Sequence, residues 1–252
     1  MAGRTKLQIS LGWSFRLNTL HFFWLQGEED LKSYRPDLYQ TQFNWIDNHP
    51  YFEIKYWDFE KLDNFVSQHY PQYKSVWEDI QKSNFNQRHI YCKMMDFTKF
   101  LVFHKYGGFY IDRDLFYLNP ITELTKHKGV VSSEKVIKER FMSNEVGIKM
   151  YNDIKKYDVL IQDCFLGFEK GSLFCIDFIE WCLKNDRKMN NTMDSFSVFA
   201  LTDYYLEDKS RFDEIKILDE DKTLFNKNSK GYCYHSFEMT WMDKSKDKPW
   251  KN

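Results

Sequence analysis

The chain has 252 residues with 36 basic and 37 acidic side chains, which gives a net charge of −1. This balance offers no global attraction to nucleic acid or to an anionic membrane, so phosphate binding would require a local site. An apolar fraction of 42% and a charged fraction of 29% exclude a disordered or fibrous protein, and the length fits a single globular domain.

No stretch approaches the ~20 apolar residues of a membrane-spanning helix, so we expect no integral membrane span. The first ten residues precede no apolar signal region. We expect a cytoplasmic protein, in a bacterial cytosol or, for a viral enzyme, in the host cytosol or virion. The five cysteines show no Cys-x-x-Cys spacing, which favours buried free thiols in a reducing compartment over a zinc site.

The predicted elements alternate between strands and helices. Strands are predicted over residues 19–25, 51–57, 109–111 and 129–133, a strand or loop over 157–167, and helices over 38–48, 58–68, 89–105 and 172–183. This order predicts an α/β, Rossmann-like fold with a mostly parallel central sheet and added helices. Ligands of such sheets bind at the carboxyl ends of the strands.

Two acidic residues, Asp112 and Asp114, directly follow the predicted strand 109–111, which begins after the Gly107-Gly108 pair that ends a helix. Two carboxylates one residue apart can turn toward one cation, and Mn²⁺ and Mg²⁺ prefer oxygen ligands. Such a cation neutralises a pyrophosphate that leaves as an anion. An Asp-x-Asp pair alone is more often part of a solvated loop, so the interpretation depends on the surrounding sequence.

The segment from His89 to Asp114 resembles the signature of glycosyltransferases with an Asp-x-Asp sugar-binding region. These family 32-like enzymes include capsular-polysaccharide and initiating α-1,6-mannosyltransferases, and the glucosylating clostridial toxins are more distant. Their helix carries Ser-Asp-x-x-Arg, followed by Leu-x-x-x-Gly-Gly-x-Tyr-x-Asp-x-Asp. The matching positions here are Asp96, Gly107, Gly108, Tyr110, Asp112 and Asp114.

Two positions depart from that signature, because Met95 replaces the usual Ser and Lys99 replaces the usual Arg. Lys99 can still place a positive charge beside the donor, but it lacks the planar, bidentate fork of an arginine. The departures leave open a catalytically weak or inactive relative that binds a nucleotide-sugar or a glycan.

Three further segments extend the resemblance. Leu20-His21-Phe-Phe-Trp24-Leu-Gln-Gly27 resembles the family's first strand, which implies that Trp24 lies near the nucleotide base, where an indole can stack; the alternative is a core position. Near the other end, His235 and Trp241 resemble the family's terminal His and Ser-Trp pair, which implies that His235 completes the metal or pyrophosphate site. Asp163 stands where relatives carry an Asn-rich loop, and it either holds a sugar hydroxyl or is an ordinary loop acid.

The resemblance implies a GT-A type nucleotide-sugar-binding fold in one domain over residues 1–252. Its nucleotide-binding part would cover roughly residues 15–120 and its acceptor and sugar part roughly 121–252. It further implies a metal-dependent, retaining transfer of a hexose from a nucleoside-diphosphate sugar, with UDP favoured and GDP as the alternative. The acceptor would be a glycan or another hydroxyl, such as that of a protein, and the cofactor Mn²⁺ or Mg²⁺.

The expected residues fall into three groups. The metal ligands are Asp112, Asp114 and His235; the catalytic residues are Asp112, Asp114 and Asp163; the nucleotide-sugar-binding residues are Trp24, Asp96, Lys99, Tyr110, Asp112 and Trp241. No dedicated nucleophile is evident, which indicates front-face attack with the leaving phosphate accepting the acceptor's proton. A second alternative function is a metal-dependent phosphodiesterase, which would need further clustered acids or histidines, and for nucleic acid a basic groove.

Overall fold

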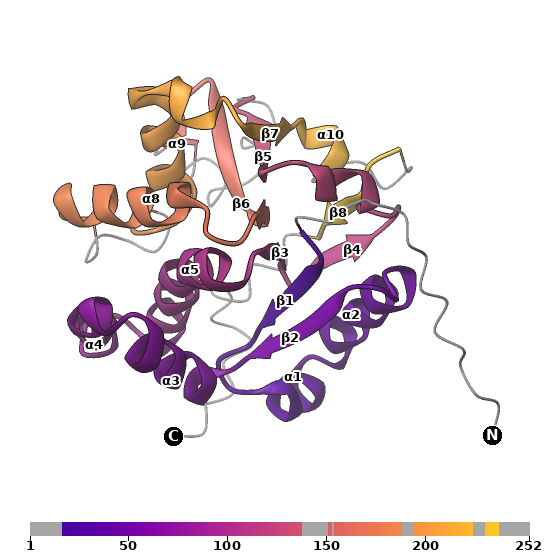
Figure 1. Ribbon diagram of the computed structural model, residues 1–252, viewed down its shortest axis with the longest axis horizontal. Coiled ribbons are helices and arrows are strands. Elements are labelled where there is room, and N and C mark those ends of the chain that lie inside the picture. The colour runs from indigo at the N-terminus through magenta and orange to yellow at the C-terminus, as the bar shows by residue number, and fades with distance from the viewer. Residues whose placement is uncertain (1–16, 138–150, 153, 188–193, 224–229, 237–252) are drawn as a thin grey trace.

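The computed structural model describes residues 17–137, 151–152, 154–187, 194–223 and 230–236. A six-stranded sheet with the order β2-β1-β3-β6-β5-β7 forms its centre (Figure 1). The strands are β1 (Thr19–Phe23), β2 (Glu53–Trp57), β3 (Gly108–Ile111), β5 (Gly129–Lys135), β6 (Val159–Phe168) and β7 (Ile215–Leu218). Strand β1 pairs in parallel with β2 and β3, and β5 pairs in parallel with β7, whereas β6 is antiparallel to both β3 and β5. The expected α/β fold with a mostly parallel sheet is therefore confirmed, with β6 as the reversed strand among those described.

A second, two-stranded sheet joins distant parts of the chain. Strand β4 (Leu115–Tyr117) follows β3 after a short turn, and it pairs antiparallel with β8 (Cys233–His235). In this register Leu115 lies opposite His235. The pairing carries the end of the described chain back to the carboxyl end of β3.

Helices cover both faces of the central sheet. They are α1 (Glu28–Tyr34), α2 (Pro36–Asn48), α3 (Phe59–His69), α4 (Lys74–Gln81), α5 (Gln87–Tyr106), α8 (Leu173–Lys184), α9 (Val198–Glu207) and α10 (Glu220–Thr223), with 3₁₀ turns η1 (Pro71–Tyr73), η2 (Thr122–Lys126) and η3 (Lys209–Phe212). Figure 1 shows α3, α4, α5, α8 and α9 on one side of the sheet, and α2 with β4 and β8 on the other. Neighbouring residues of a strand point to opposite faces, so Tyr110 packs into the first of these layers while Phe109 and Ile111 pack into the second.

The start of β3 is fixed by glycines and by a buried histidine. Gly107 and Gly108 have φ angles of 66° and 110°, and a Cβ on Gly108 would lie 2.5 Å from the Thr19 carbonyl oxygen. The His21 Nδ1 accepts from the Trp57 indole at 3.1 Å, so its Nε2 carries the proton and donates to the Gly107 carbonyl at 2.6 Å. Burial lowers the pKa of His21 to about 4, which keeps the ring neutral. These contacts set where β3, and the acidic pair after it, begin.

Most elements predicted from local pattern agree with the structure to within about two residues, which is the usual spread of such boundaries. The segment predicted as a strand or a loop over 157–167 is strand β6. Helices α1, α4, α9 and α10 and strands β4, β7 and β8 were not predicted, and most of them are short segments in which a periodic pattern is hard to recognise. Four cysteines are buried and Cys92 is partly exposed, all as free thiols. Within the described ranges, no helix combines the length and the apolar character that crossing a membrane requires.

Candidate active site

The acidic pair lies in a tight turn between β3 and β4. The Leu115 amide donates to the Asp112 carbonyl at 3.0 Å, and Asp112 Oδ1 accepts from the Arg113 amide at 2.9 Å. Aspartate favours the first position of such turns because its side chain satisfies the next backbone amides. The Asp112 amide also donates to the Cys164 carbonyl at 3.0 Å, which extends the ladder with β6. The turn therefore holds both carboxylates at the carboxyl edge of the sheet.

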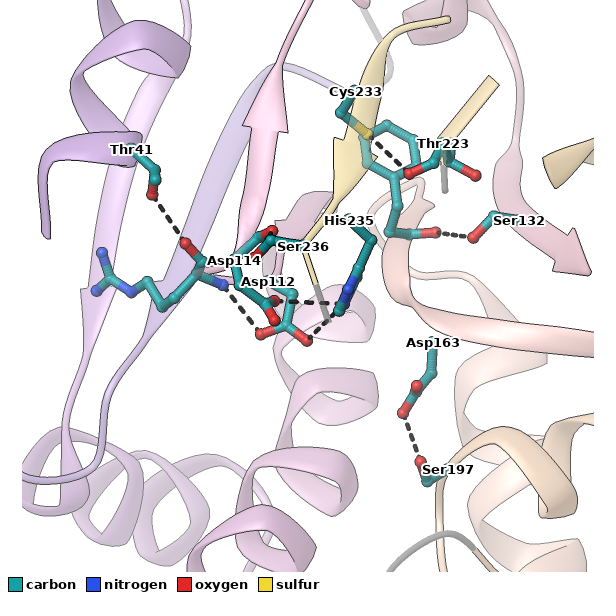
Figure 2. A network of polar contacts seen from close by, with 12 residues as sticks. Thr41, Asp112, Asp114, Ser132, Asp163, Ser197, Thr223, Cys233, His235 and Ser236 are labelled. Atoms are coloured by element: carbon teal, nitrogen blue, oxygen red, sulfur yellow. Dashed lines mark hydrogen bonds and ion pairs between the residues drawn. The ribbon is translucent and has the colours of Figure 1, made fainter. Parts of the chain in front are cut away.

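His235 joins this pair from β8. Its Nε2 lies 3.3 Å from Asp114 Oδ1 and 3.9 Å from Asp112 Oδ2, and the Ser236 amide donates to the Asp114 carbonyl at 3.1 Å. One ligand atom from each of the three side chains lies within 4.8 Å of the others (Figure 2). The structure thus brings together the three residues for which a metal-binding role is expected.

The charges at this site favour a cation. Burial raises the pKa of Asp112, but its contact with His235 and the positive charges of His235 and Lys99 outweigh burial and hold that pKa below its usual value. Burial lowers the pKa of His235, yet its contact with Asp112 and the charges of Asp114 and Asp112 raise it overall. A position where an imidazole gains affinity for a proton also suits a metal cation. Two carboxylates and an imidazole form a donor set that fits a divalent metal cation.

A second cluster centres on Lys99, whose side chain is 1% exposed. Its ammonium donates to Asp96 Oδ1 at 2.8 Å and to Asp163 Oδ2 at 2.6 Å, and Ser197 Oγ donates to the same Asp163 oxygen at 2.7 Å. The ammonium also lies 5.2 Å from the centre of the Tyr110 ring. Helix α5, strand β6, the residue before α9 and strand β3 therefore meet at one point. Two members of this group, Asp163 and Ser197, lie near the Asp112, Asp114 and His235 cluster in Figure 2.

One ammonium shared by two carboxylates leaves an excess of negative charge. Burial raises the pKa of Asp96 to about 7, and the charge of Asp163 adds to that effect while Lys99 opposes it. Burial lowers the pKa of Lys99, but the charges of Asp163 and Asp96 raise it above its usual value. The two clusters act on each other, because Lys99 lowers the pKa of Asp112 and Asp163 raises that of His235.

The two tryptophans expected at the site differ in what the structure describes. Trp24 is partly exposed just after β1, and its indole nitrogen donates to Asp30 Oδ1 in α1 at 2.8 Å. Trp241 lies outside the described residues. The placement of Trp24 at the carboxyl end of β1 is compatible with the expected contact to a base, which stays a prediction.

Sequence patterns did not identify Ser197. Ser197 directly precedes α9, and its Oγ donates to Asp163 on β6. Arg187 holds the segment before it: the guanidinium pairs with Asp194 and with Asp203 Oδ2, the latter at 2.6 Å, and the Arg187 carbonyl accepts from Ser195 Oγ at 2.9 Å. No local motif marks such a residue, because its partner Asp163 is contributed by another element.

Comparisons with known proteins agree with the resemblance. Residues 36–131 match the family described as a glycosyltransferase sugar-binding region containing a DXD motif. A glycosyltransferase of Acanthamoeba polyphaga mimivirus, itself described as uncharacterized, is 25% identical over 99 residues, which are 39% of this chain and 35% of the viral protein. The solved structure of the PaToxG glycosyltransferase is 13% identical, with a TM-score of 0.41 over 77% of this chain and 69% of that one. The chain thus matches only about a third of the length of its viral relative.

Proposed function

We propose that this chain, whose residues 36–131 carry the sugar-binding region of the DXD glycosyltransferases, is a metal-dependent, retaining glycosyltransferase acting as a single domain. It would move a hexose from a nucleoside-diphosphate sugar, preferably a UDP-sugar, to a hydroxyl of a glycan or a protein. The observation that carries the proposal is the meeting of Asp112, Asp114 and His235 within 4.8 Å at the carboxyl edge of the sheet. The Lys99 cluster directly beside it supplies a second group of polar side chains for the sugar.

The ligand chemistry supports a resident cation. Asp114 and His235 would bind Mn²⁺ directly, with Asp112 as a further ligand or as an acceptor for the ribose. A divalent cation at this position supplies the positive charge that stabilises a departing diphosphate. The protein holds the ligands in place through the turn that contains Asp112 and through the pairing of β8 with β4.

The Lys99 cluster would bind the sugar. One oxygen of Asp96 and one of Asp163 accept from the Lys99 ammonium, so the second oxygen of each carboxylate can accept from a sugar hydroxyl. Lys99 would fix both carboxylates, because a fully buried ammonium between two acids has little freedom to turn. Two neighbouring acceptors select a neutral sugar with free hydroxyls over one that carries a carboxylate.

We expect retention of the anomeric configuration, in line with the family resemblance. The bond from the anomeric carbon to the diphosphate breaks while the acceptor oxygen bonds on the same face, and the acceptor's proton passes to the departing phosphate oxygen. We assign Asp163 to a sugar hydroxyl rather than to the alternative double displacement, because Lys99 and Ser197 hold its Oδ2 and orient the carboxylate as a hydrogen-bond acceptor. Positioning and electrostatic stabilisation would then supply the catalysis.

The test is a panel of UDP- and GDP-hexoses incubated with the protein and Mn²⁺, with release of the nucleoside diphosphate measured. We expect release with at least one donor, and a loss on the order of a hundredfold or more in Asp114→Asn. The matched control is Asp213→Asn, an exposed aspartate that caps η3 and should leave activity unchanged. Full activity of Asp114→Asn with the metal chelated would refute the proposal. Binding of a donor without any release would identify a non-catalytic relative, and cleavage of a simple phosphodiester would favour the phosphodiesterase.

A further inference from the structure

Arg113, the residue between the two aspartates, is 4% exposed and has its polar contacts on elements other than the acidic cluster. Its Nε donates to the Phe23 carbonyl at 3.2 Å, its Nη1 donates to Gln42 Oε1 at 2.8 Å, and its Nη2 pairs with Glu28. Its carbonyl accepts from Thr41 Oγ1 at 2.8 Å (Figure 2). Each of its three guanidinium nitrogens therefore has a partner.

These partners come from three different elements. Phe23 is the last residue of β1, Glu28 is the first residue of α1, and Gln42 lies on α2. The guanidinium also lies 5.0 Å above the centre of the Phe22 ring, inside the apolar layer on that face of the sheet. The turn is therefore anchored through its middle residue, whose side chain contacts β1, α1 and α2 rather than the expected cation ligands.

The same contacts hold the segment between β1 and α1. Arg113 binds both ends of the stretch from Phe23 to Glu28, and Trp24 lies within it. The second carboxylate oxygen of Glu28 is buried and has no hydrogen-bond partner among the described residues, so its charge depends on Arg113 for compensation. One side chain thus joins the turn that carries Asp112 and Asp114 to the segment that carries Trp24.

We propose that Arg113 is a positioning residue that couples the position of the cation-binding turn to the position of the segment from Trp24 to Glu28. A change at Glu28, remote from the cation, then alters cation affinity, and a nucleoside bound at Trp24 orders the turn. The identity of these ligands rests on the proposed function, whereas the mechanical link rests on the contacts alone. A lysine cannot replace Arg113, because a single ammonium cannot reach three acceptors in the geometry of the planar fork.

The link is tested first without any ligand, by amide hydrogen exchange followed by mass spectrometry. We expect Arg113→Lys to accelerate exchange in two separate stretches, residues 23–31 and residues 112–117. The matched control is Arg211→Lys. The native Arg211 pairs with Glu207 and donates to the Tyr204 carbonyl, away from both stretches, so this variant should leave their exchange rates unchanged. Faster exchange confined to residues 112–117 would overturn the link.

The second readout is the affinity for Mn²⁺ alone, measured by the electron paramagnetic resonance signal of the free ion. Arg113→Lys and Glu28→Gln should each weaken binding by about tenfold, since residues that support metal ligands typically contribute ten- to a hundredfold. Glu28→Gln nearly preserves the side-chain shape and provides the same test if Arg113→Lys does not fold. Once Arg113 is replaced, adding Glu28→Gln should change affinity less than twofold, because the interaction is already lost.

The outcomes separate this inference from the proposed function. Unchanged Mn²⁺ affinity in both Arg113→Lys and Glu28→Gln, in a wild-type protein that binds Mn²⁺, would overturn the positioning role. If the variants show the expected changes in hydrogen exchange and in Mn²⁺ affinity but the wild type transfers no sugar, the proposed function is refuted. The positioning role of Arg113 then still stands.

Discussion

Acidification should unfold this protein partly through one side chain, His21, which lies on β1 and is fully buried beside Trp57 and the Gly107 carbonyl. Its pKa is about 4 in the folded protein against 6.5 for a free histidine, with burial as the largest cause. Between these values the unfolded chain binds a proton that the folded protein does not, so the stabilising contribution is complete above pH 6.5 and is lost as the pH falls toward 4. At 1.36 kcal/mol per pKa unit, the free energy of unfolding should fall by about 2 kcal/mol between pH 7 and pH 5, and by about 3 kcal/mol in total below pH 4.

The assay is urea unfolding, followed by tryptophan fluorescence at a series of pH values, for the wild type and for His21→Gln. The glutamine can still donate to the Gly107 carbonyl but has no proton to gain, so the wild type should lose about 2 kcal/mol more than the variant between pH 7 and pH 5. Other histidines titrate in both proteins and cancel in the difference. His69→Gln, at an exposed position on α3, is the control and should follow the wild type. Parallel curves for the wild type and His21→Gln would refute the reasoning.

Three other variants test the site and its support. Gly108→Ala should lower the free energy of unfolding by about 3 kcal/mol, because its Cβ would lie 2.5 Å from the Thr19 carbonyl oxygen at a φ of 110°. Gly171→Ala, with a φ of 80° but no atom within 4 Å of its Cβ, should cost only about 1 kcal/mol in the same thermal or urea melts. Ser197→Ala should reduce kcat/KM for the donor by about tenfold, because Asp163 loses a charge-assisted hydrogen bond, and an unchanged value would show that Lys99 alone fixes that carboxylate. Trp24→Ala should weaken UDP binding about tenfold, as expected for a lost base stack, while Trp24→Phe retains most of the affinity; equal affinity of Trp24→Ala and the wild type would exclude stacking.

Lys99 stands where the similar glycosyltransferases carry an arginine, and the structure shows which groups surround it. The ammonium lies between Asp96 and Asp163 and is 1% exposed, so its charge is matched by two local carboxylates. An arginine would present a wider, planar group to the same two acids. The departure therefore affects how Asp96 and Asp163 are held, whereas the turn with Asp112 and Asp114 is supported separately by Arg113.

The sequence alone determined the local parts of this protein. Helix α5, the glycine pair, strand β3 and the acidic pair follow one another along the chain, and each is marked by apolar periodicity or by a residue that accepts a positive φ. Such signals depend on neighbours within a few residues, so they can be read without knowing the fold. Placement of Asp112 and Asp114 at a strand's carboxyl end followed from the same local order.

Only the tertiary structure decided which distant residues meet there. The pairing of β8 with β4 places His235 beside Asp114, and the reversed strand β6 brings Asp163 to Lys99. The burial of Arg113 against Phe23, Glu28 and Gln42 likewise has no counterpart in the local pattern. These contacts join segments separated by long stretches of chain, and they form because sheet pairing and core packing leave each charged group few partners. Family resemblance indicated His235 and Asp163 as candidates, but distance and burial assign their neighbours.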